Sequence, residues 1–396
     1  MAEFYPSRRD PVLGIWAHRQ ALAARDAGAE VRVLALHRLL PPRATLASGA
    51  AGAARALARR LREQRHQVRD GLQIDYVPYV SPPRERSYAS WGAWAAPALA
   101  YALRRLRRSF EFELVHAHNA VPAGEAVRLA RPRVPLVVSV HGGDVLWTAR
   151  RSDAGAAAVA RGLGAARLVL ANSHGTAELA RAHGAGETRV VHLGADLPAG
   201  SRAPRGEGLR ARGEDPQTLV TVAHLVARKR HADVVRALAV LSQKHPTLRY
   251  AIVGEGPERV ALEGLARRLG VAARVDFHGQ LAHDRAESLA QRSTLFVMPS
   301  TEEAFGVAYV EAMAGSVPAI GCRGEPGPEE IAAAGDGLVL VPPGDVERLT
   351  QRIDELLGDP HRLREAGQRA RATVAANFTW ERCGEQTLAA YEHVLD

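Results

Sequence analysis

The chain has 396 residues, which is more than one compact core usually supports, so we expect two α/β domains. With 46% hydrophobic and 24% charged residues, the composition is that of a globular protein and excludes long-range disorder. The net charge of +9 favours anionic partners such as phosphates or lipid head groups, but no nucleic acid is expected because no recognised binding module accompanies the charge.

Short β-branched runs alternate with longer Ala-, Leu- and Arg-rich stretches along the chain, a pattern typical of βαβ units and buried parallel sheets. In the first half we predict strands at residues 31–36, 114–117, 136–140, 168–171 and 189–192. In the second half we predict strands at residues 219–223, 250–253, 275–277, 295–299 and 318–321.

The domain organisation follows from composition along the chain. A helix expected at 16–27 normally follows a complete first strand, but only MAEFYP stands in that place, so either the first strand is shortened or the start is placed too late. A Gly-, Pro- and charge-rich stretch predicts a linker at 196–217, between a domain at 1–195 and a domain at 218–375. The tail, 376–396, is predicted to be helical.

The location of the protein is predicted from its cysteines and its hydrophobic runs. Cys322 and Cys383 lie far apart without metal-ligand spacing, which fits a reducing cytoplasm. The first residues contain no apolar segment of a signal peptide, and no uncharged apolar run reaches the roughly 20 residues that span a bilayer. We therefore expect a cytoplasmic protein, either soluble or peripheral on the inner face of the membrane.

The most informative segment is MPSTEEAFGVAYVEAMAGSVPAIG. A strand leads into a polar loop with Glu303, then Ala304, Phe305 and Gly306, and the following helix carries Glu311. A carboxylate beside a helix N-terminus suits a sugar diphosphate, because the amides attract phosphate while carboxylates bind hydroxyls. The alternative is a capped surface helix with incidental acids.

A second segment, VTVAHLVARKRHADVVRAL, places Arg228, Lys229 and Arg230 between a strand and a helix. A cation there would neutralise a diphosphate as it departs. The alternative is that Arg228 or Arg230 lies on a solvated face.

Three weaker signals lie in the first half. In VVSVHGGDVLW, His141 ends a strand, where open α/β sheets bind ligands, and Asp144 would orient the imidazole or cap the next helix. Gly14 precedes the first helix, and His118 either lines the acceptor side or is structural.

Together these segments resemble glycosyltransferase family 4. Glu303, seven intervening residues and Glu311 are similar to the E-x7-E motif of that family, and HGGDV, ANS, VGEGPER and VDFHGQL follow in the family's order. The resemblance covers nearly the whole chain. The opening DPVLGIWAHRQALAARDAGAEVRVL is similar to the branch that makes cell-surface polysaccharides, including teichuronic acid biosynthesis proteins.

The resemblance implies a GT-B fold, in which two Rossmann-like domains with parallel sheets face each other across a cleft. The N-terminal domain would bind the acceptor, the C-terminal domain the nucleotide sugar, and the tail helix would pack back on the first domain. Family members are retaining enzymes with UDP-, GDP- or ADP-sugar donors, so no further cofactor is expected. By this likeness Glu303 would hold donor-sugar hydroxyls, Glu311 the ribose, and His141 the sugar near its reacting carbon. The residues assigned to the donor are Gly14, His224, Lys229, Glu303, Ala304, Phe305, Gly306 and Glu311, and those assigned to catalysis are His141, Glu303 and Lys229.

One motif departs from the family pattern. The family segment G-R-L-x-x-x-K-G aligns Lys229 with the phosphate-binding lysine, but His224 stands at the arginine position and Arg230 at the following glycine. A neutral imidazole donates one hydrogen bond where a guanidinium offers a permanently charged fork. Either Arg228 or Arg230 compensates, or donor handling is altered.

Two motifs are absent from the sequence. It contains no Asp-X-Asp, so we expect metal-independent transfer, and no P-loop, which argues against a P-loop NTPase.

A candidate acceptor region is SYASWGAWAAPALAYALRRLRRS, where aromatic residues precede Arg104, Arg105, Arg107 and Arg108, with further arginines at 55–69. This pattern suits a helix on an anionic membrane surface as well as it suits a packed helix with a solvated end.

We therefore expect a retaining hexosyltransferase that uses a nucleotide sugar to glycosylate a glycan or polyprenyl-linked acceptor in cell-surface polysaccharide biosynthesis. The alternatives are a nucleotide-sugar-binding protein with lost turnover and a sugar-nucleotide epimerase of the same fold. A dinucleotide oxidoreductase is disfavoured, because VGEGPER lacks the third glycine of the fingerprint.

Overall fold

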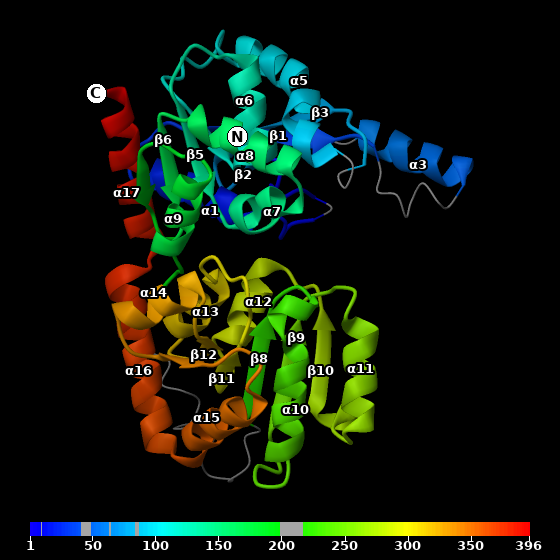
Figure 1. The fold of residues 1–396 in the computed structure, drawn as a ribbon, viewed down its shortest axis with the longest axis vertical. Coiled ribbons are helices and arrows are strands. Elements are labelled where there is room, and N and C mark those ends of the chain that lie inside the picture. The colour runs from blue at the N-terminus through cyan, green and yellow to red at the C-terminus, as the bar shows by residue number, and fades with distance from the viewer. Residues whose placement is uncertain (9, 41–48, 63–64, 84–86, 199–216) are drawn as a thin grey trace. The chain divides into compact units, whose positions relative to one another are not determined.

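The computed structural model describes residues 1–8, 10–40, 49–62, 65–83, 87–198 and 217–396. The chain forms two compact units (Figure 1): unit 1 comprises Met1–His192 and Cys383–Asp396, and unit 2 comprises Leu193–Arg382. Most of the linker expected at 196–217 lies outside the described residues. The chain is α/β with mainly parallel strands, as the alternating pattern predicts.

Unit 1 contains two sheets, of order β2-β3-β1 and β4-β5-β6-β7. Ala2 joins them, because it forms parallel bridges with both Ala35 of β1 and His118 of β4. The strands are β1 (Arg32–Arg38), β2 (His66–Arg69), β3 (Leu72–Tyr79), β4 (Val115–His118), β5 (Leu136–Val140), β6 (Leu168–Ala171) and β7 (Thr188–Val190). The helices are α1 (Ile15–Asp26), α3 (Ala50–Leu61), α5 (Trp91–Leu106), α6 (Glu125–Ala130), α7 (Ala149–Arg151), α8 (Asp153–Gly164), α9 (His174–Ala182) and most of α17 (Trp380–Leu395).

Unit 2 has one parallel sheet of order β10-β9-β8-β11-β12-β13 (Figure 1). Its strands are β8 (Thr218–Val222), β9 (Arg249–Val253), β10 (Val275–Gly279), β11 (Leu295–Val297), β12 (Ala319–Cys322) and β13 (Leu338–Val341). Its helices are α10 (His231–Leu241), α11 (Arg259–Arg268), α12 (His283–Ala290), α13 (Val307–Ala314), α14 (Pro326–Ala334), α15 (Val346–Gly358) and α16 (Pro360–Asn377). The direction in which strands are added reverses between β8 and β11, and open α/β sheets bind ligands beyond the carboxyl ends of the strands at such a switch point.

The strands that the sequence analysis did not predict are β2, β3 and β13. The strands β2 and β3 are antiparallel and are joined by Asp70 and Gly71, both of which have positive φ angles, of 49° and 80°. An Asp-Gly pair between alternating residues is a strong hairpin signal, so this turn was available in the sequence. No helix in the described part of the chain is both long and apolar enough to cross a membrane.

Helix α17 packs against the sheet of unit 1 through polar contacts at β4 and β7. The hydroxyl of Tyr391 lies 2.7 Å from Nδ1 of His116 in β4, and Nε2 of His393 lies 2.7 Å from a carboxylate oxygen of Glu187, next to β7. Since His116 also contacts Ser139 at 2.7 Å, both of its ring nitrogens have partners.

Replacing Tyr391 with Phe should destabilise unit 1 by about 1–2 kcal/mol, because one nitrogen of a desolvated imidazole loses its partner. Urea unfolding followed by tryptophan fluorescence measures this change. Tyr101→Phe is the matched control, since Tyr101 is 64% exposed and its replacement should leave the midpoint unchanged. Equal midpoints for the two variants would contradict the structural role of the Tyr391 hydroxyl.

Candidate active site

The loop between β11 and α13 carries Glu303, and its shape depends on α13. The hydroxyl of Tyr309 donates to the carbonyl of Met298, which ties the helix to the end of the strand. Gly306 begins the helix with φ of 90°, and a Cβ there would lie 2.4 Å from the ring of Tyr309. This position therefore requires glycine for both its conformation and its space.

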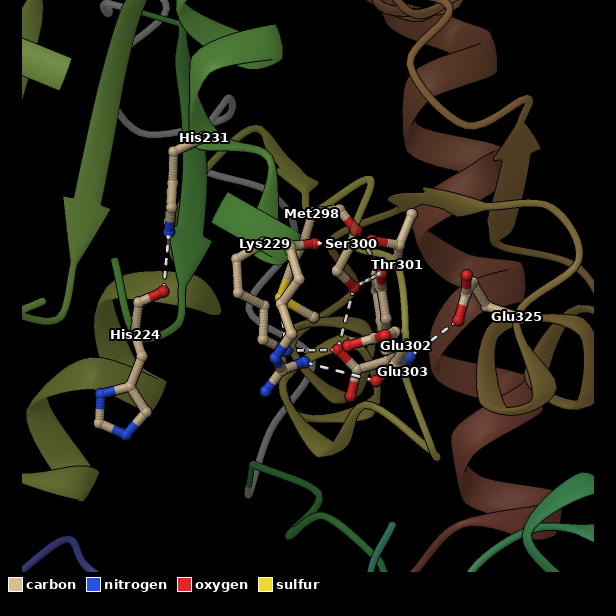
Figure 2. Close-up of polar contacts among 11 residues, drawn as sticks. His224, Lys229, His231, Met298, Ser300, Thr301, Glu302, Glu303 and Glu325 are labelled. Atoms are coloured by element: carbon tan, nitrogen blue, oxygen red, sulfur yellow. Dashed lines mark hydrogen bonds and ion pairs between the residues drawn. The ribbon is translucent and has the colours of Figure 1, made fainter. Parts of the chain in front are cut away.

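Glu303 is a buried carboxylate with a cationic partner (Figure 2). Its Oε2 contacts Nζ of Lys229 and accepts a hydrogen bond of 2.9 Å from the hydroxyl of Ser300. Burial raises the pKa of Glu303, but the charge and hydrogen bond of Lys229 outweigh burial, so the pKa is lowered overall. The carboxylate of Glu303 is therefore ionised at neutral pH, although the residue is buried and only 9% exposed.

Lys229 reaches Glu303 because β8 and β11 are neighbours in the sheet. Lys229 ends a short 3-10 turn (Ala227–Lys229) that follows β8. The backbone N–H of Thr301 donates to the carbonyl of Arg228 at 2.8 Å, which joins the two loops directly. The structure thus brings the Glu303 loop and the turn with Lys229 into contact at the switch point of the sheet.

The structure also distinguishes Arg228 from Arg230, the two residues that could compensate for His224 at the arginine position of the family motif. Arg230 has a positive φ of 56° and binds Asp233 at 2.6 Å, so its guanidinium is engaged within α10. Arg228 lies beside the Glu303 loop, donates to the carbonyl of Glu302 at 3.4 Å, and contributes to the lowered pKa of Glu303. His224 is exposed, and Figure 2 shows its ring apart from the Lys229–Glu303 pair. Of the two arginines, only Arg228 adds positive charge to the Glu303 loop.

Glu325 is a residue of this cluster that the sequence analysis missed. Its carboxylate accepts a hydrogen bond of 2.8 Å from the backbone N–H of Glu303, on the opposite side of the loop from Lys229 (Figure 2). Burial and the nearby charge of Glu303 raise the pKa of Glu325. The available signal was its place just after β12, at the carboxyl end of a parallel strand.

The remaining candidates of unit 2 surround this loop. Glu311 is buried in α13 with its carboxylate 3.6 Å from Nε2 of His283. The side chains of Ala304 and Phe305 are buried, and the Phe305 ring packs edge-on against Phe378. In the described residues no group of three or more His, Cys, Asp or Glu side chains is arranged to hold a metal ion.

The candidates of unit 1 form a second cluster around His141, at the end of β5. Its Nε2 lies 3.1 Å from Nδ1 of His118, and the two rings are stacked. The His118 ring also stacks on His116. Burial lowers the pKa of His141 to about 4 and lowers those of His116 and His118 well below their usual value, so the three rings are neutral at pH 7.

Trp16, which closely follows Gly14 in the chain, packs against His141. Gly14 has φ of 72°, and a Cβ there would lie 2.1 Å from the carbonyl oxygen of Phe4, so only glycine fits. The ring of Trp16 packs 6.1 Å from that of His141. Nε1 of Trp16 and Nδ1 of His141 are buried and have no hydrogen-bond partner among the described residues. Such orphaned groups are rare and indicate where a ligand or water would bind.

Asp144 has neither of the roles considered for it. Its carboxylate accepts hydrogen bonds from the backbone N–H groups of Ala120 and Val121, at 2.9 and 3.2 Å, and from the Asn119 amide at 3.3 Å. Burial raises its pKa to about 6. Asp144 therefore holds the backbone that follows β4, and it neither orients His141 nor caps the next helix along the chain.

Comparison with known proteins covers both units. Residues 14–198 match the family model described as Glycosyltransferase Family 4, and residues 210–373 match that described as Glycosyl transferases group 1. The D-inositol 3-phosphate glycosyltransferase 1 of Catenulispora acidiphila is 30% identical over 350 residues, or 83% of this chain and 82% of that protein. An exopolysaccharide phosphotransferase of Streptomyces coelicolor is 36% identical over 166 residues, which are 41% of this chain but only 17% of that protein.

Solved structures show the same fold. Sucrose-phosphate synthase from Thermosynechococcus elongatus aligns with a TM-score of 0.76 and 21% identity, over 96% of this chain and 92% of that chain. Anabaena HepE, solved in complex with UDP, aligns with a TM-score of 0.68 and 21% identity, over 95% of this chain and 96% of that chain.

Acidification should destabilise unit 1, because the unfolded chain protonates its histidines near pH 6.5 whereas folded His141 stays neutral to about pH 4. Stability is therefore complete above pH 6.5 and falls as the pH drops towards 4. Between pH 6.5 and 5, His141 alone accounts for about 2 kcal/mol at most.

Urea unfolding at a series of pH values, followed by tryptophan fluorescence, tests this dependence. His141→Asn should flatten the slope, whereas His66→Asn, at a side chain that is 55% exposed, should leave it unchanged. An unaltered slope in His141→Asn would show that its ring is not desolvated.

Proposed function

The chain belongs to glycosyltransferase family 4 and has the GT-B fold, and from that premise we propose that it is a retaining sugar transferase. The donor is a nucleotide-diphosphate sugar, and the acceptor is a hydroxyl of a glycan or of a lipid-linked glycan. The observation that carries this proposal is the contact between Lys229 and Glu303 at the switch point of unit 2. The HepE complexes with UDP and with UDP-glucose make a UDP-sugar the first donor to test.

Lys229 suits the diphosphate of such a donor, and Glu303 suits the hydroxyls of its sugar. A diphosphate attracts Lys229, and the N-terminus of α13 adds backbone N–H groups and a favourable dipole. As Lys229 turns to the phosphate, Glu303 exchanges its cation for sugar hydroxyls, which donate to a carboxylate that is already ionised. Arg228 supplies the additional positive charge that the departing diphosphate requires.

His141 suits a role beside the sugar because its ring is neutral. A neutral imidazole has one donor and one acceptor, so its unpaired Nδ1 can bind a hydroxyl without repelling an electron-poor anomeric carbon. We favour substitution on one face of the sugar, in which the leaving diphosphate assists the incoming hydroxyl. Positioning of the two substrates would then supply several kcal/mol of the rate enhancement.

A role in cell-surface polysaccharide biosynthesis draws support from the match to an exopolysaccharide phosphotransferase. The proposed location is the cytoplasmic side of the membrane, where the exposed face of α5 would contact anionic lipid. Trp94 and Tyr101 are 48% and 64% exposed, and Arg104 and Arg105 follow in the last turn, whereas Leu99 on the other side is buried. Aromatic side chains beside arginines are typical of an interfacial helix.

The donor proposal is tested by a thermal-shift panel of UDP-, GDP- and ADP-sugars, followed by transfer assays with the donor that stabilises. Glu303→Gln should reduce kcat/KM by at least about tenfold, because a charged hydrogen-bond acceptor is worth about 1.5–3 kcal/mol. Glu302→Gln, in the same loop but exposed, is the matched control and should stay within about twofold of wild type.

Analysis of the products separates the rival functions. A changed sugar nucleotide without any acceptor would indicate an epimerase, and binding without hydrolysis or transfer would indicate a binding protein.

The membrane proposal predicts binding to vesicles of phosphatidylglycerol but not to vesicles of phosphatidylcholine. Replacing Trp94, Arg104 and Arg105 with Ala should weaken sedimentation with the anionic vesicles at least about fivefold, since each cation near the surface is worth about 1 kcal/mol. Replacing Arg267 and Arg268 at the end of α11 removes equal charge elsewhere and should have little effect. Equal losses in the two variants would indicate non-specific charge attraction and exclude docking through α5.

A further inference from the structure

Unit 1 contains a cavity of about 350 Å³ that belongs to neither cluster described above. Its walls come from the ends of β1 and β3, the end of α3 and the loop after Ala2. The lining residues are Ser7, Arg8, His37, Leu39, Arg59, Arg60, Leu61, Arg62, Arg65, Gln67, Tyr76 and Pro78. Its volume is within the range of small-molecule sites, and it lies at the carboxyl ends of parallel strands, where such sheets bind ligands.

The lining of this cavity is strongly cationic. The guanidinium groups of Arg8, Arg59, Arg62 and Arg65 have no ion pair or hydrogen bond with any other described residue. None of the described residues that line the cavity is an Asp or a Glu.

The arginines of α3 concentrate positive charge beside the cavity. Arg55, Arg59 and Arg62 follow at intervals of four and three residues, so they lie on one side of the helix. Like charges at this spacing destabilise a helix, and the first turn of α3 contains no acidic residue to offset them. An anionic ligand would remove this repulsion.

Other lining residues hold the cavity in shape. Arg60 donates to the carbonyl of Leu40 at 3.4 Å, which anchors the end of α3 beside β1. Tyr76 donates to the carbonyl of Pro6 at 2.8 Å, and its backbone N–H donates to the carbonyl of Arg65 at 2.8 Å. Arg8, Arg59, Arg62 and Arg65 therefore line a cavity whose walls are held in place by contacts of other residues.

We propose that this cavity binds a phosphate or diphosphate group of the acceptor. The planar forks of several arginines match phosphate oxygens in geometry and charge. The proposal rests on the proposed function, which it makes more specific: the acceptor is an anionic, phosphate-bearing glycan or glycolipid and not a neutral sugar. The phosphate can come from a soluble sugar phosphate or from a lipid-linked diphosphate, which share this chemistry.

The first experiment measures the affinity of the cavity for a phosphate ligand in the absence of sugar transfer. Protein with Lys229→Ala, which removes the phosphate-binding lysine of unit 2, is titrated with inorganic pyrophosphate by calorimetry. Adding Arg59→Ala and Arg62→Ala should lower the affinity at least about tenfold, because two charge-assisted contacts are lost. Adding Arg267→Ala and Arg268→Ala, an equal loss of charge at the exposed end of α11, should change it less than about twofold. Thermal midpoints confirm that the variants are folded.

The second experiment compares acceptors in the otherwise wild-type enzyme. A sugar linked to a short prenyl diphosphate, the same sugar 1-phosphate and the neutral alkyl glycoside are assayed for transfer. The Arg59→Ala, Arg62→Ala variant should raise KM for the phosphorylated acceptors at least about fivefold while leaving the donor KM and the neutral acceptor unchanged. A preference for the prenyl diphosphate over the sugar phosphate identifies the lipid-linked source, and the reverse identifies the soluble one.

Three outcomes overturn the proposal. Pyrophosphate affinity does not depend on Arg59 and Arg62, or neutral and phosphorylated acceptors are used equally well. In the third outcome, the Arg59→Ala, Arg62→Ala variant loses vesicle binding and nothing else. The last outcome would make α3 part of a lipid surface. If no acceptor is glycosylated while pyrophosphate affinity still depends on Arg59 and Arg62, the cavity stands as a phosphate site and only the transfer function fails.

Discussion

The contact between Lys229 and Glu303 is the interaction on which the arrangement of the loops at the switch point of unit 2 depends. Neither charge is stable alone in this buried position, because removing one partner of a buried pair costs about 3–5 kcal/mol. The pair therefore holds the loops after β8 and β11 together, with Ser300 and Glu325 fixing the carboxylate and its backbone. In the proposed function, the donor diphosphate would take the place of Glu303 beside Lys229, and sugar hydroxyls would take the place of Lys229 beside Glu303.

The histidine cluster of unit 1 differs from the Lys229–Glu303 pair because its rings carry no charge. The rings of His116, His118 and His141 are desolvated and neutral, and the orphaned nitrogens of His141 and Trp16 offer hydrogen bonds without net charge. In the proposed function, such neutral groups would orient a hydroxyl by hydrogen bonding without adding charge.

Much of this protein was predictable from local patterns. The alternation of short apolar strands and helices predicted the α/β class, which the structure confirms. The sugar-diphosphate site inferred from the Glu303 segment and the basic turn at Lys229 stays a prediction. Glu325 and the role of Asp144 were not predictable in the same way, because each acts on the backbone of a loop that is distant in sequence. Nothing in the local residues indicates which backbone N–H groups will lie beside a carboxylate.

The sequence by itself determined the class of fold, the residues that carry charge and the glycines that special backbone conformations demand. Only the tertiary structure decided which charges become partners. Arg228 and Arg230 are equivalent in the sequence, but the order of strands places Arg228 beside the loop of Glu302, while a positive φ turns Arg230 to Asp233. The physical reason is that pairing across 74 residues depends on which strands are neighbours in the sheet, and that order is set by the packing of the whole unit.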